Sequence, residues 1–209
     1  MVSMHMTIPG YYHTHCGQYH ARTFHIDPAP FLSAFVEMLP PGAHVLDIGC
    51  GSGRDLLWLT KRGFRATGFD ASPGLASLAR QHSGCTVIEG DFEIYDFSNL
   101  RADALLLSGA LVHLPHDRMK PVLQSVLRAV AGRHSALVYL SLKEGEAAYT
   151  DKQNRVFHPW RDPDARAVFH EIGLEMTHFS RTSSRLGTGE VWLGYVLVRK
   201  SGSPIKEAE

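Results

Sequence analysis

The sequence is poor in cysteine, carries no excess of charge and has no long apolar run. Its three cysteines, Cys16, Cys50 and Cys85, are widely spaced, which excludes a disulfide framework or a zinc-ligand pattern and indicates a reducing compartment. Lysine plus arginine number 21 and aspartate plus glutamate number 21, so no overall positive field attracts nucleic acid or an anionic membrane. No window is long enough to span a bilayer, and residues 1–6 lack the features of a signal peptide. We therefore expect a cytoplasmic monomer or homodimer without nucleic-acid or membrane partners.

Short apolar runs alternate with helical patterns through the middle of the chain. Five runs predict buried strands, at residues 44–48, up to Asp70, at 86–88, at 104–107 and at 136–140. Helical patterns cover residues 54–62, a segment opening at Ser72-Pro73, residues 119–130 and a segment opening at Asp162-Pro163. This alternation predicts parallel strands joined by crossover helices.

The end of the chain breaks the alternation. Two extended segments, 174–182 and 190–199, are separated by a loop of about seven residues that contains Gly187 and Gly189. So short a loop joins antiparallel neighbours and cannot form a parallel crossover. We predict a doubly wound α/β fold with a mostly parallel seven-stranded sheet, an antiparallel C-terminal hairpin strand and helices on both faces.

A chain of 209 residues is too short for two ordinary domains. We expect a single domain over residues 1–200, with residues 1–30 as an N-terminal lid segment. The polar residues 201–209 are expected to form a disordered tail.

The strongest motif lies between the first strand and the helix that follows it. Gly49, Gly51 and Gly53 stand at alternate positions, where glycine lets the backbone approach a ligand closely. Asp70 ends the second strand, where a carboxylate can accept both hydroxyls of a ribose. Asp91, after the third strand, can accept an adenine amino group while Phe92 packs on the ring.

These residues resemble the class I S-adenosylmethionine-dependent methyltransferases, with a D-x-G-x-G-x-G loop beginning at Asp47, an acid ending the second strand and a Gly-Asp pair after the third. The resemblance implies S-adenosylmethionine as cofactor and a pocket at the carboxyl ends of the first three strands. The candidate cofactor-binding residues are Tyr12, Tyr19, Arg22, Asp47, Gly49, Cys50, Gly51, Gly53, Asp70, Ala71, Asp91, Phe92 and Ser108. No metal site is expected among the N-terminal histidines, which show no helical HxxxH pair.

A narrower resemblance is to small bacterial methyltransferases akin to the tellurite-resistance methyltransferases. Residues 12–23, 108–115 and 139–146 carry it. Residues 13–18 depart from that group, which has an acidic or asparagine-rich stretch between its two tyrosines.

The resemblance implies methyl transfer to a small-molecule acceptor through an oxygen, nitrogen, sulfur or similar nucleophile. His113, after the fourth strand, and Tyr19 are the candidate catalytic residues; Arg22 can pair with a carboxylate, and tyrosine faces suit a sulfonium cation. Residues 143–155 form a polar loop where a substrate lid would lie, although such a run is equally typical of a solvated surface.

Three other functions are weighed against this one. A non-catalytic S-adenosylmethionine-binding protein has the same loop. An NAD(P)-dependent oxidoreductase is disfavoured because the glycines run GxGxG rather than GxGxxG. Methylation of a nucleobase amine is disfavoured because Ser108-Gly109-Ala110 stands where an Asn/Asp-Pro-Pro-aromatic stretch is expected.

Overall fold

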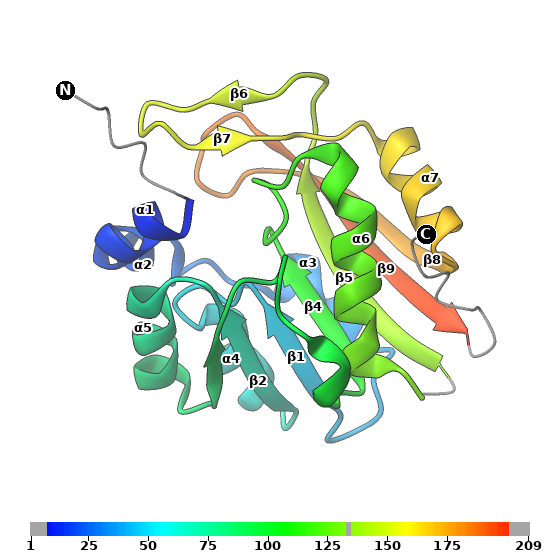
Figure 1. The fold of residues 1–209 in the computed structure, drawn as a ribbon. Helices are drawn as coiled ribbons and strands as arrows, with labels where there is room; N and C mark the ends of the chain where they lie inside the picture. Colours follow the sequence, from blue (N-terminus) through cyan, green and yellow to red (C-terminus); the bar gives the residue numbers. More distant parts are fainter. Residues whose placement is uncertain (1–7, 133–134, 201–209) are drawn as a thin grey trace.

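The protein is described by a computed structural model that covers residues 8–132 and 135–200. A seven-stranded sheet forms its centre (Figure 1). In spatial order its strands are β3 (Val87–Glu89), β2 (Arg65–Asp70), β1 (His44–Ile48), β4 (Ala104–Ser108), β5 (Ser135–Lys143), β9 (Val191–Lys200) and β8 (Leu174–Ser183). A separate two-stranded hairpin consists of β6 (Tyr149–Thr150) and β7 (Val156–Phe157). The expected tail at residues 201–209 lies outside the described residues.

Helices cover both faces of the sheet. They are α1 (Ile8–Thr14), α2 (Cys16–Thr23), α3 (Ala29–Val36), α4 (Arg54–Thr60), α5 (Pro73–Ser83), α6 (His116–Val126) and α7 (Asp162–Glu171), with 3-10 turns at Phe97–Asn99 and Leu127–Val130. Helix α5 begins as predicted: Ser72 Oγ accepts a hydrogen bond from the Leu75 amide at 3.3 Å, and Pro73 occupies the first turn. None of these described helices is long and apolar enough to span a membrane.

The sheet has the predicted topology. Strands β3, β2, β1, β4 and β5 pair in parallel, whereas β9 is antiparallel to both β5 and β8. The β8–β9 connection, residues 184–190, is too short to carry the chain back over the sheet, so β9 must run in the reverse direction. The predicted reversed strand is confirmed, and it lies inside the sheet rather than at its edge.

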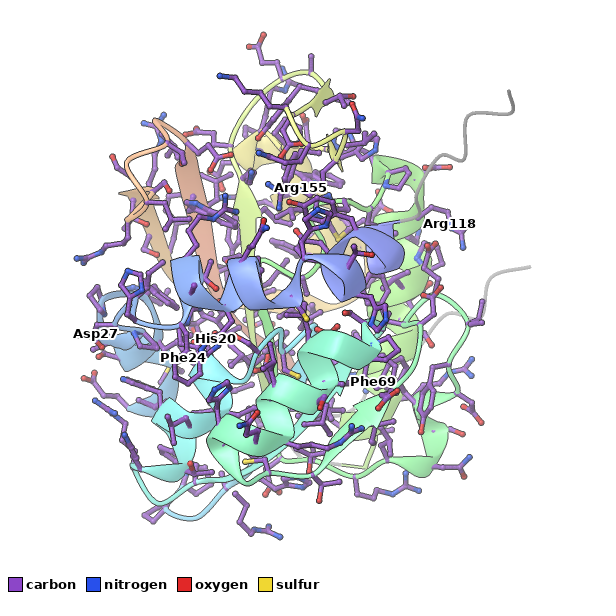
Figure 2. All side chains as sticks on the ribbon, turned by 90° about the vertical axis from the view of Figure 1, so that its left-hand side faces the viewer. His20, Phe24, Asp27, Phe69, Arg118 and Arg155 are labelled. Carbon is purple, nitrogen blue, oxygen red and sulfur yellow. The ribbon has the colours of Figure 1, made fainter. Side chains whose placement is uncertain are left out.

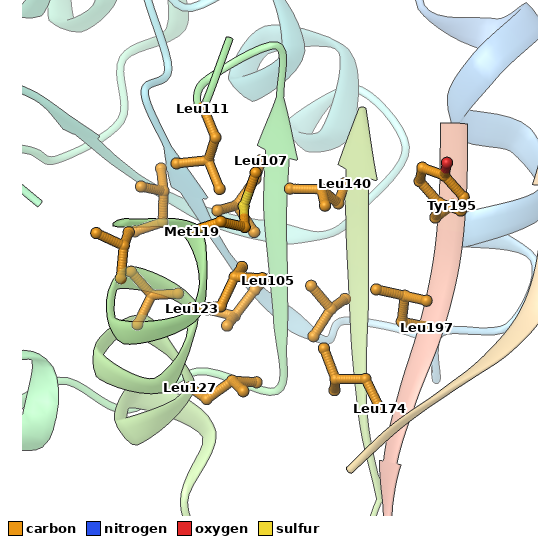
Figure 3. Packing of buried hydrophobic residues seen from close by; sticks show 14 of the residues in the cluster. Leu105, Leu107, Leu111, Met119, Leu123, Leu127, Leu140, Leu174, Tyr195 and Leu197 are labelled. Carbon is orange, nitrogen blue, oxygen red and sulfur yellow. The ribbon is translucent and has the colours of Figure 1, made fainter. Parts of the chain in front are cut away.

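Each face of the sheet has its own apolar core. Residues of β4 such as Leu105 and Leu107 pack against Met119 and Leu123 of α6 (Figure 3). On the opposite face, Leu106 packs with residues of α3 and α4 in a second cluster. Successive residues of a strand point to opposite faces, so a continuous apolar run such as residues 104–107 indicates a strand buried on both sides.

The segments at the carboxyl ends of the strands differ most from the sequence expectations. The predicted lid contains two short helices, α1 and α2, which lie over α5, and hairpin β6–β7 stands beyond the ends of β4 and β5 (Figures 1 and 2). Lys143, expected in a polar loop, is the last residue of β5. Strand β9 pairs with β5 as far as Lys143 opposite Trp192, and this pairing extends β5 beyond its predicted end.

Candidate active site

A cavity of about 200 Å³ opens at the carboxyl ends of β1, β2 and β4, beneath the N-terminal helices. It is lined by Tyr12, Tyr19, Gly49, Gly51, Phe69, Asp70, Ala71, Ser72, Leu75, Asp91, Phe92, Glu93, Ser108, Gly109, Ala110, His113 and Leu114. Open α/β sheets bind ligands at this position, where strand order reverses and the loops diverge. The three charged residues of the lining are all acidic, so the cavity favours a cationic ligand.

The glycine loop forms the floor of the cavity. The amides of Gly49 and Cys50 both donate to the Phe69 carbonyl, at 2.7 and 3.1 Å, and this fixes the loop against β2. Gly49 and Gly51 have φ values of +70° and +56°, a region that residues with a side chain rarely adopt. A Cβ on Gly51 would lie 3.3 Å from the Tyr19 ring. The loop therefore needs glycine both for its backbone conformation and for the close approach of Tyr19.

Asp70 is held rigidly at the edge of this floor. Its Oδ2 accepts the Gly51 amide at 2.8 Å, and its Oδ1 accepts the Ser72 amide at 2.9 Å. Each carboxylate oxygen offers more than one acceptor position, so both can accept a further donor from the cavity. Burial raises the pKa of Asp70 to about 6, although the two amide bonds oppose this shift.

Acidic side chains outnumber basic ones beneath the glycine loop. Asp47 is almost fully buried, and its Oδ2 has no hydrogen-bond partner among the described residues. Arg54 is held by Asp55 through two bonds of 2.7 and 2.9 Å. Burial raises the pKa of Asp47, and the nearby Asp55 raises it further. Three carboxyl groups, counting Asp70, thus face one guanidinium, and a cation bound above the loop would relieve this imbalance.

Tyr12 and His113, which both line the cavity, contact each other and a third segment that is distant in sequence. Tyr12 of α1 lies with its Oη 2.9 Å from His113 Nε2, and His113 Nδ1 lies 2.5 Å from the Val156 carbonyl of hairpin β6–β7. Arg155 donates to Tyr12 Oη at 3.2 Å. Burial lowers the pKa of His113 to about 4 and raises the pKa of Tyr12. Both side chains are therefore uncharged at neutral pH.

The cavity contains most of the site residues predicted from the sequence. Those that line it are Tyr12, Tyr19, Gly49, Gly51, Asp70, Ala71, Asp91, Phe92, Ser108 and His113. Asp47 and Cys50 are buried but do not line it. The roles assigned to all of these residues stay predictions.

Two further residues that were predicted to bind the cofactor also do not line the cavity. Arg22 is exposed on α2 and does not line the cavity. Gly53 begins α4 with a φ of +85°, and a Cβ there would lie 2.8 Å from Ala79 Cα of α5. Close packing of α4 on α5 therefore explains a glycine at this position without a ligand.

Sequence reasoning missed part of the lining and two buried cations, Lys143 and Arg155. Among the missed lining residues, Phe69 and Ser72 flank the predicted Asp70 and Ala71, so their position next to these residues was the available signal. Arg155 was assigned to a polar loop, yet it is 7% exposed and forms a two-pronged ion pair with Asp151. Its contact with Tyr12 joins residues 143 positions apart, which no local pattern indicates.

The glycine loop, the acid ending β2 and the reversed strand β9 define a Rossmann-like fold of the class I methyltransferase type. Residues 45–132 match the family described as "Methyltransferase domain". Together with the relatives below, this match confirms the resemblance to class I S-adenosylmethionine-dependent methyltransferases.

Two curated relatives extend the similarity beyond that segment. Cypemycin N-terminal methyltransferase from Streptomyces sp. is 30% identical over 168 residues, which cover 78% of this chain and 64% of the relative. 2-Heptyl-1-hydroxyquinolin-4(1H)-one methyltransferase from Mycobacteroides abscessus is 28% identical over 149 residues, covering 68% and 63%. The chain thus spans somewhat less than two thirds of the length of both relatives.

Solved structures share the fold over most of the chain. 1,6-Didemethyltoxoflavin-N1-methyltransferase from Burkholderia thailandensis matches with a TM-score of 0.71 and 20% identity, covering 90% of this chain and 84% of its own. A TehB-like methyltransferase from Corynebacterium glutamicum matches with a TM-score of 0.65 and 22% identity, covering 90% and 99%.

Proposed function

We propose that this protein is an S-adenosylmethionine-dependent methyltransferase that acts on a small-molecule acceptor. The observation that carries the proposal is the cavity at the ends of β1, β2 and β4, in which Gly51, Asp70 and Asp91 lie together. These residues were selected from three separate sequence motifs. Their convergence on one cavity supports a common ligand.

The residues present fit this cofactor. Asp70 is oriented by two backbone amides and can accept ribose hydroxyls, while Asp91 and Phe92 lie where they can hold adenine. The acidic surplus around Asp47, with its unpartnered oxygen, suits a ligand that carries sulfonium and ammonium charges. When bound, S-adenosylmethionine supplies a methyl group that is already activated for transfer.

Catalysis by this chain then consists mainly of positioning and of excluding water. Tyr19 lies against the glycine loop, so we assign it to the cofactor side of the cavity. Tyr12 and His113 also line the cavity and contact each other, and we assign them to the acceptor side. Holding the reacting atoms at about 3 Å in the correct geometry accounts for much of the rate enhancement of such transfers.

The proposed acceptor is small because the cavity has a volume of about 200 Å³ and is lined by Tyr12 of α1 and Tyr19 of α2. The names of the relatives that act on cypemycin, a hydroxyquinolinone and didemethyltoxoflavin support this choice. We also propose a cytoplasmic location, where free cysteines such as Cys50 stay reduced.

Isothermal titration with S-adenosylhomocysteine, run beside NADH, tests the proposal. We expect micromolar binding of S-adenosylhomocysteine and no heat from NADH. Binding of NADH alone would instead establish a nicotinamide-binding protein. Binding of neither compound would contradict a role for the cavity as a cofactor site.

A further inference from the structure

The hydrogen bond between Tyr12 and His113 has a defined direction. The Val156 carbonyl only accepts hydrogen bonds, so His113 Nδ1, 2.5 Å away, must carry the imidazole proton. The uncharged imidazole then has a bare Nε2. Tyr12 Oη, 2.9 Å from that nitrogen, is therefore the donor. His113 is prepared to receive a proton through Tyr12.

Tyr12 Oη has one acceptor position left for a ligand. A phenol oxygen has one proton and two lone pairs, and here the proton points to His113. One lone pair accepts the Arg155 Nη1 donor at 3.2 Å. Since Tyr12 also lines the cavity, its second lone pair can accept a hydrogen bond from a molecule bound there.

Arg155 keeps this hydroxyl in place. Its guanidinium is fixed by Asp151, with Nε and Nη2 both bonded to Oδ2, at 2.9 and 2.6 Å. The cation also lies over the rings of Tyr11, Tyr12 and Phe157, at 5.0, 5.7 and 5.2 Å from their centroids. Arg155, labelled in Figure 2 beside the N-terminal helices, is thus a positioning residue that favours negative charge on Tyr12 Oη.

On the basis of the proposed methyltransferase function, we propose that Tyr12 and His113 form a proton relay and that the acceptor group is a hydroxyl or the acidic N–H of a heterocycle, since a methylated ordinary amine would keep its proton. A thiolate, or any other nucleophile that carries no proton, would not need this relay. The relay thus narrows the acceptor to a protic nucleophile.

With a hydroxyl acceptor, the transfer moves one methyl group and one proton. Its oxygen lone pair forms the new bond to the methyl carbon, while the electron pair of the breaking carbon–sulfur bond stays on sulfur. The acceptor proton moves to Tyr12 Oη as the Tyr12 proton moves to His113 Nε2. The products are a methyl ether, a neutral thioether and an imidazolium that later loses its proton to water.

A weakly basic imidazole is adequate for this step. An oxygen that has gained a methyl group and still holds its proton is a strong acid, so His113 receives that proton downhill. Burial lowers the pKa of His113, and Arg155 and Lys143 lower it further, to about 4 against the raising effects of the Val156 hydrogen bond and of Asp151. His113 is therefore unprotonated, and ready to accept, throughout the neutral range.

The first test needs no acceptor and no cofactor. Imidazole ¹⁵N spectra of the full chain at pH 7, with His113→Gln to assign the signals, should show His113 as the uncharged Nδ1–H tautomer. Tyr12→Phe should shift its Nε2 resonance, and Tyr11→Phe should not. A charged imidazole or an Nε2–H tautomer would overturn the relay.

The matched control for activity is Tyr11→Phe. Tyr11 neighbours Tyr12 at 5.4 Å between ring centroids and stacks on His15, but it does not line the cavity. Methyl transfer is measured with the hydroxyl probe 2-heptyl-1-hydroxyquinolin-4(1H)-one, the N–H probe 1,6-didemethyltoxoflavin and benzenethiol.

We expect transfer to a protic probe, with kcat about a hundredfold lower in Tyr12→Phe and His113→Gln, as is typical for loss of proton transfer. Tyr11→Phe should keep its kcat. Transfer to benzenethiol alone, or a kcat for Tyr12→Phe within about threefold of the original, would overturn the inference. If none of the three probes is methylated, the imidazole spectra alone test the relay. Titration with S-adenosylhomocysteine distinguishes failure of the relay from failure of the proposed function. Every variant should bind S-adenosylhomocysteine with an affinity within about threefold of that of the original protein.

Discussion

At the residue scale, the cavity depends on side chains whose ordinary chemistry is altered by burial. Asp70 binds two backbone amides and still has its pKa raised to about 6. Its carboxylate therefore changes charge near pH 6. The glycines of the loop beneath Asp70 are constrained in a different way, by the limited space around them.

Cofactor affinity should depend on the protonation of Asp70. Above about pH 6 the carboxylate is ionised and accepts ribose hydroxyls, whereas below that pH it is protonated and loses this capacity. We expect S-adenosylhomocysteine affinity to fall about tenfold between pH 7 and pH 5. Asp70→Asn should bind about tenfold to a few hundredfold more weakly at pH 7 and show little change with pH. Titration calorimetry at both pH values measures this, and an equally steep pH profile in Asp70→Asn would contradict it.

Gly51→Val should remove cofactor binding for a steric reason. The new side chain would meet the Tyr19 ring 3.3 Å from its Cβ and extend toward the cavity. Gly63→Val is the control, because Gly63 has a similar left-handed φ of +83° but no atom within 4 Å. Both variants bear backbone strain of roughly 1–2 kcal/mol, and only Gly51→Val should lose affinity by more than about tenfold. Equal affinities, measured by titration calorimetry, would show that the cavity does not bind cofactor at the loop.

At the scale of elements, the site depends on the packing of α4 against α5, which is close at Gly53 and Ala79. Helix α4 begins directly after the glycine loop, and α5 begins directly after Asp70, so any change in their separation moves both parts of the site. Helices α1 and α2 then lie across α5, where the His20 and His82 rings stack 4.1 Å apart. The position of α5 thus influences both the cavity floor and its cover.

Gly53→Ala should destabilise the contact between α4 and α5. The added Cβ would lie 2.8 Å from Ala79 Cα and 3.0 Å from its carbonyl, and backbone atoms cannot move aside as a flexible side chain can. We expect a loss of about 1–3 kcal/mol from overpacking, in addition to the strain at positive φ. Gly84→Ala, at the end of α5 with a φ of +71° and nothing within 4 Å, reports the strain alone. Urea unfolding compares the two, and equal midpoints would mean that the helices separate at little cost.

At the scale of the whole molecule, cofactor binding and folding are linked. The cavity is formed by residues from α1, α2, α5, β2 and β4, together with the loops that follow β1, β2, β3 and β4. A ligand that contacts all of them binds only the folded chain. Its binding free energy therefore adds to the stability of the entire domain.

S-adenosylhomocysteine at a hundred times its dissociation constant should stabilise the protein by about 2.7 kcal/mol. For a chain of 209 residues this corresponds to a rise in Tm of about 5–10 °C. Differential scanning fluorimetry with NADH as the control measures the rise. A shift that is the same for both compounds would indicate unspecific stabilisation.

The sequence alone was sufficient for the parts of the molecule whose signals are local. Burial on both sides makes strands such as residues 104–107 continuously apolar, and the short connection before β9 requires a reversed strand. The glycine loop and Asp70 were predictable because positive φ angles and strand ends have characteristic residues. Helix ends were predicted less well, since the chain after Thr60 and Val126 tightens into turns that periodicity does not distinguish from helix.

Only the tertiary structure decided what closes the cavity. The contacts of Tyr12 with His113 and Arg155 join residues 101 and 143 positions apart, and Lys143 belongs to β5 because β9 pairs alongside it. Gly53, which belongs to the same motif as Gly51, packs against a neighbouring helix and does not line the cavity. Local sequence determines backbone conformation and the burial of each element, but side chains brought together by separate elements meet only when the whole chain has packed.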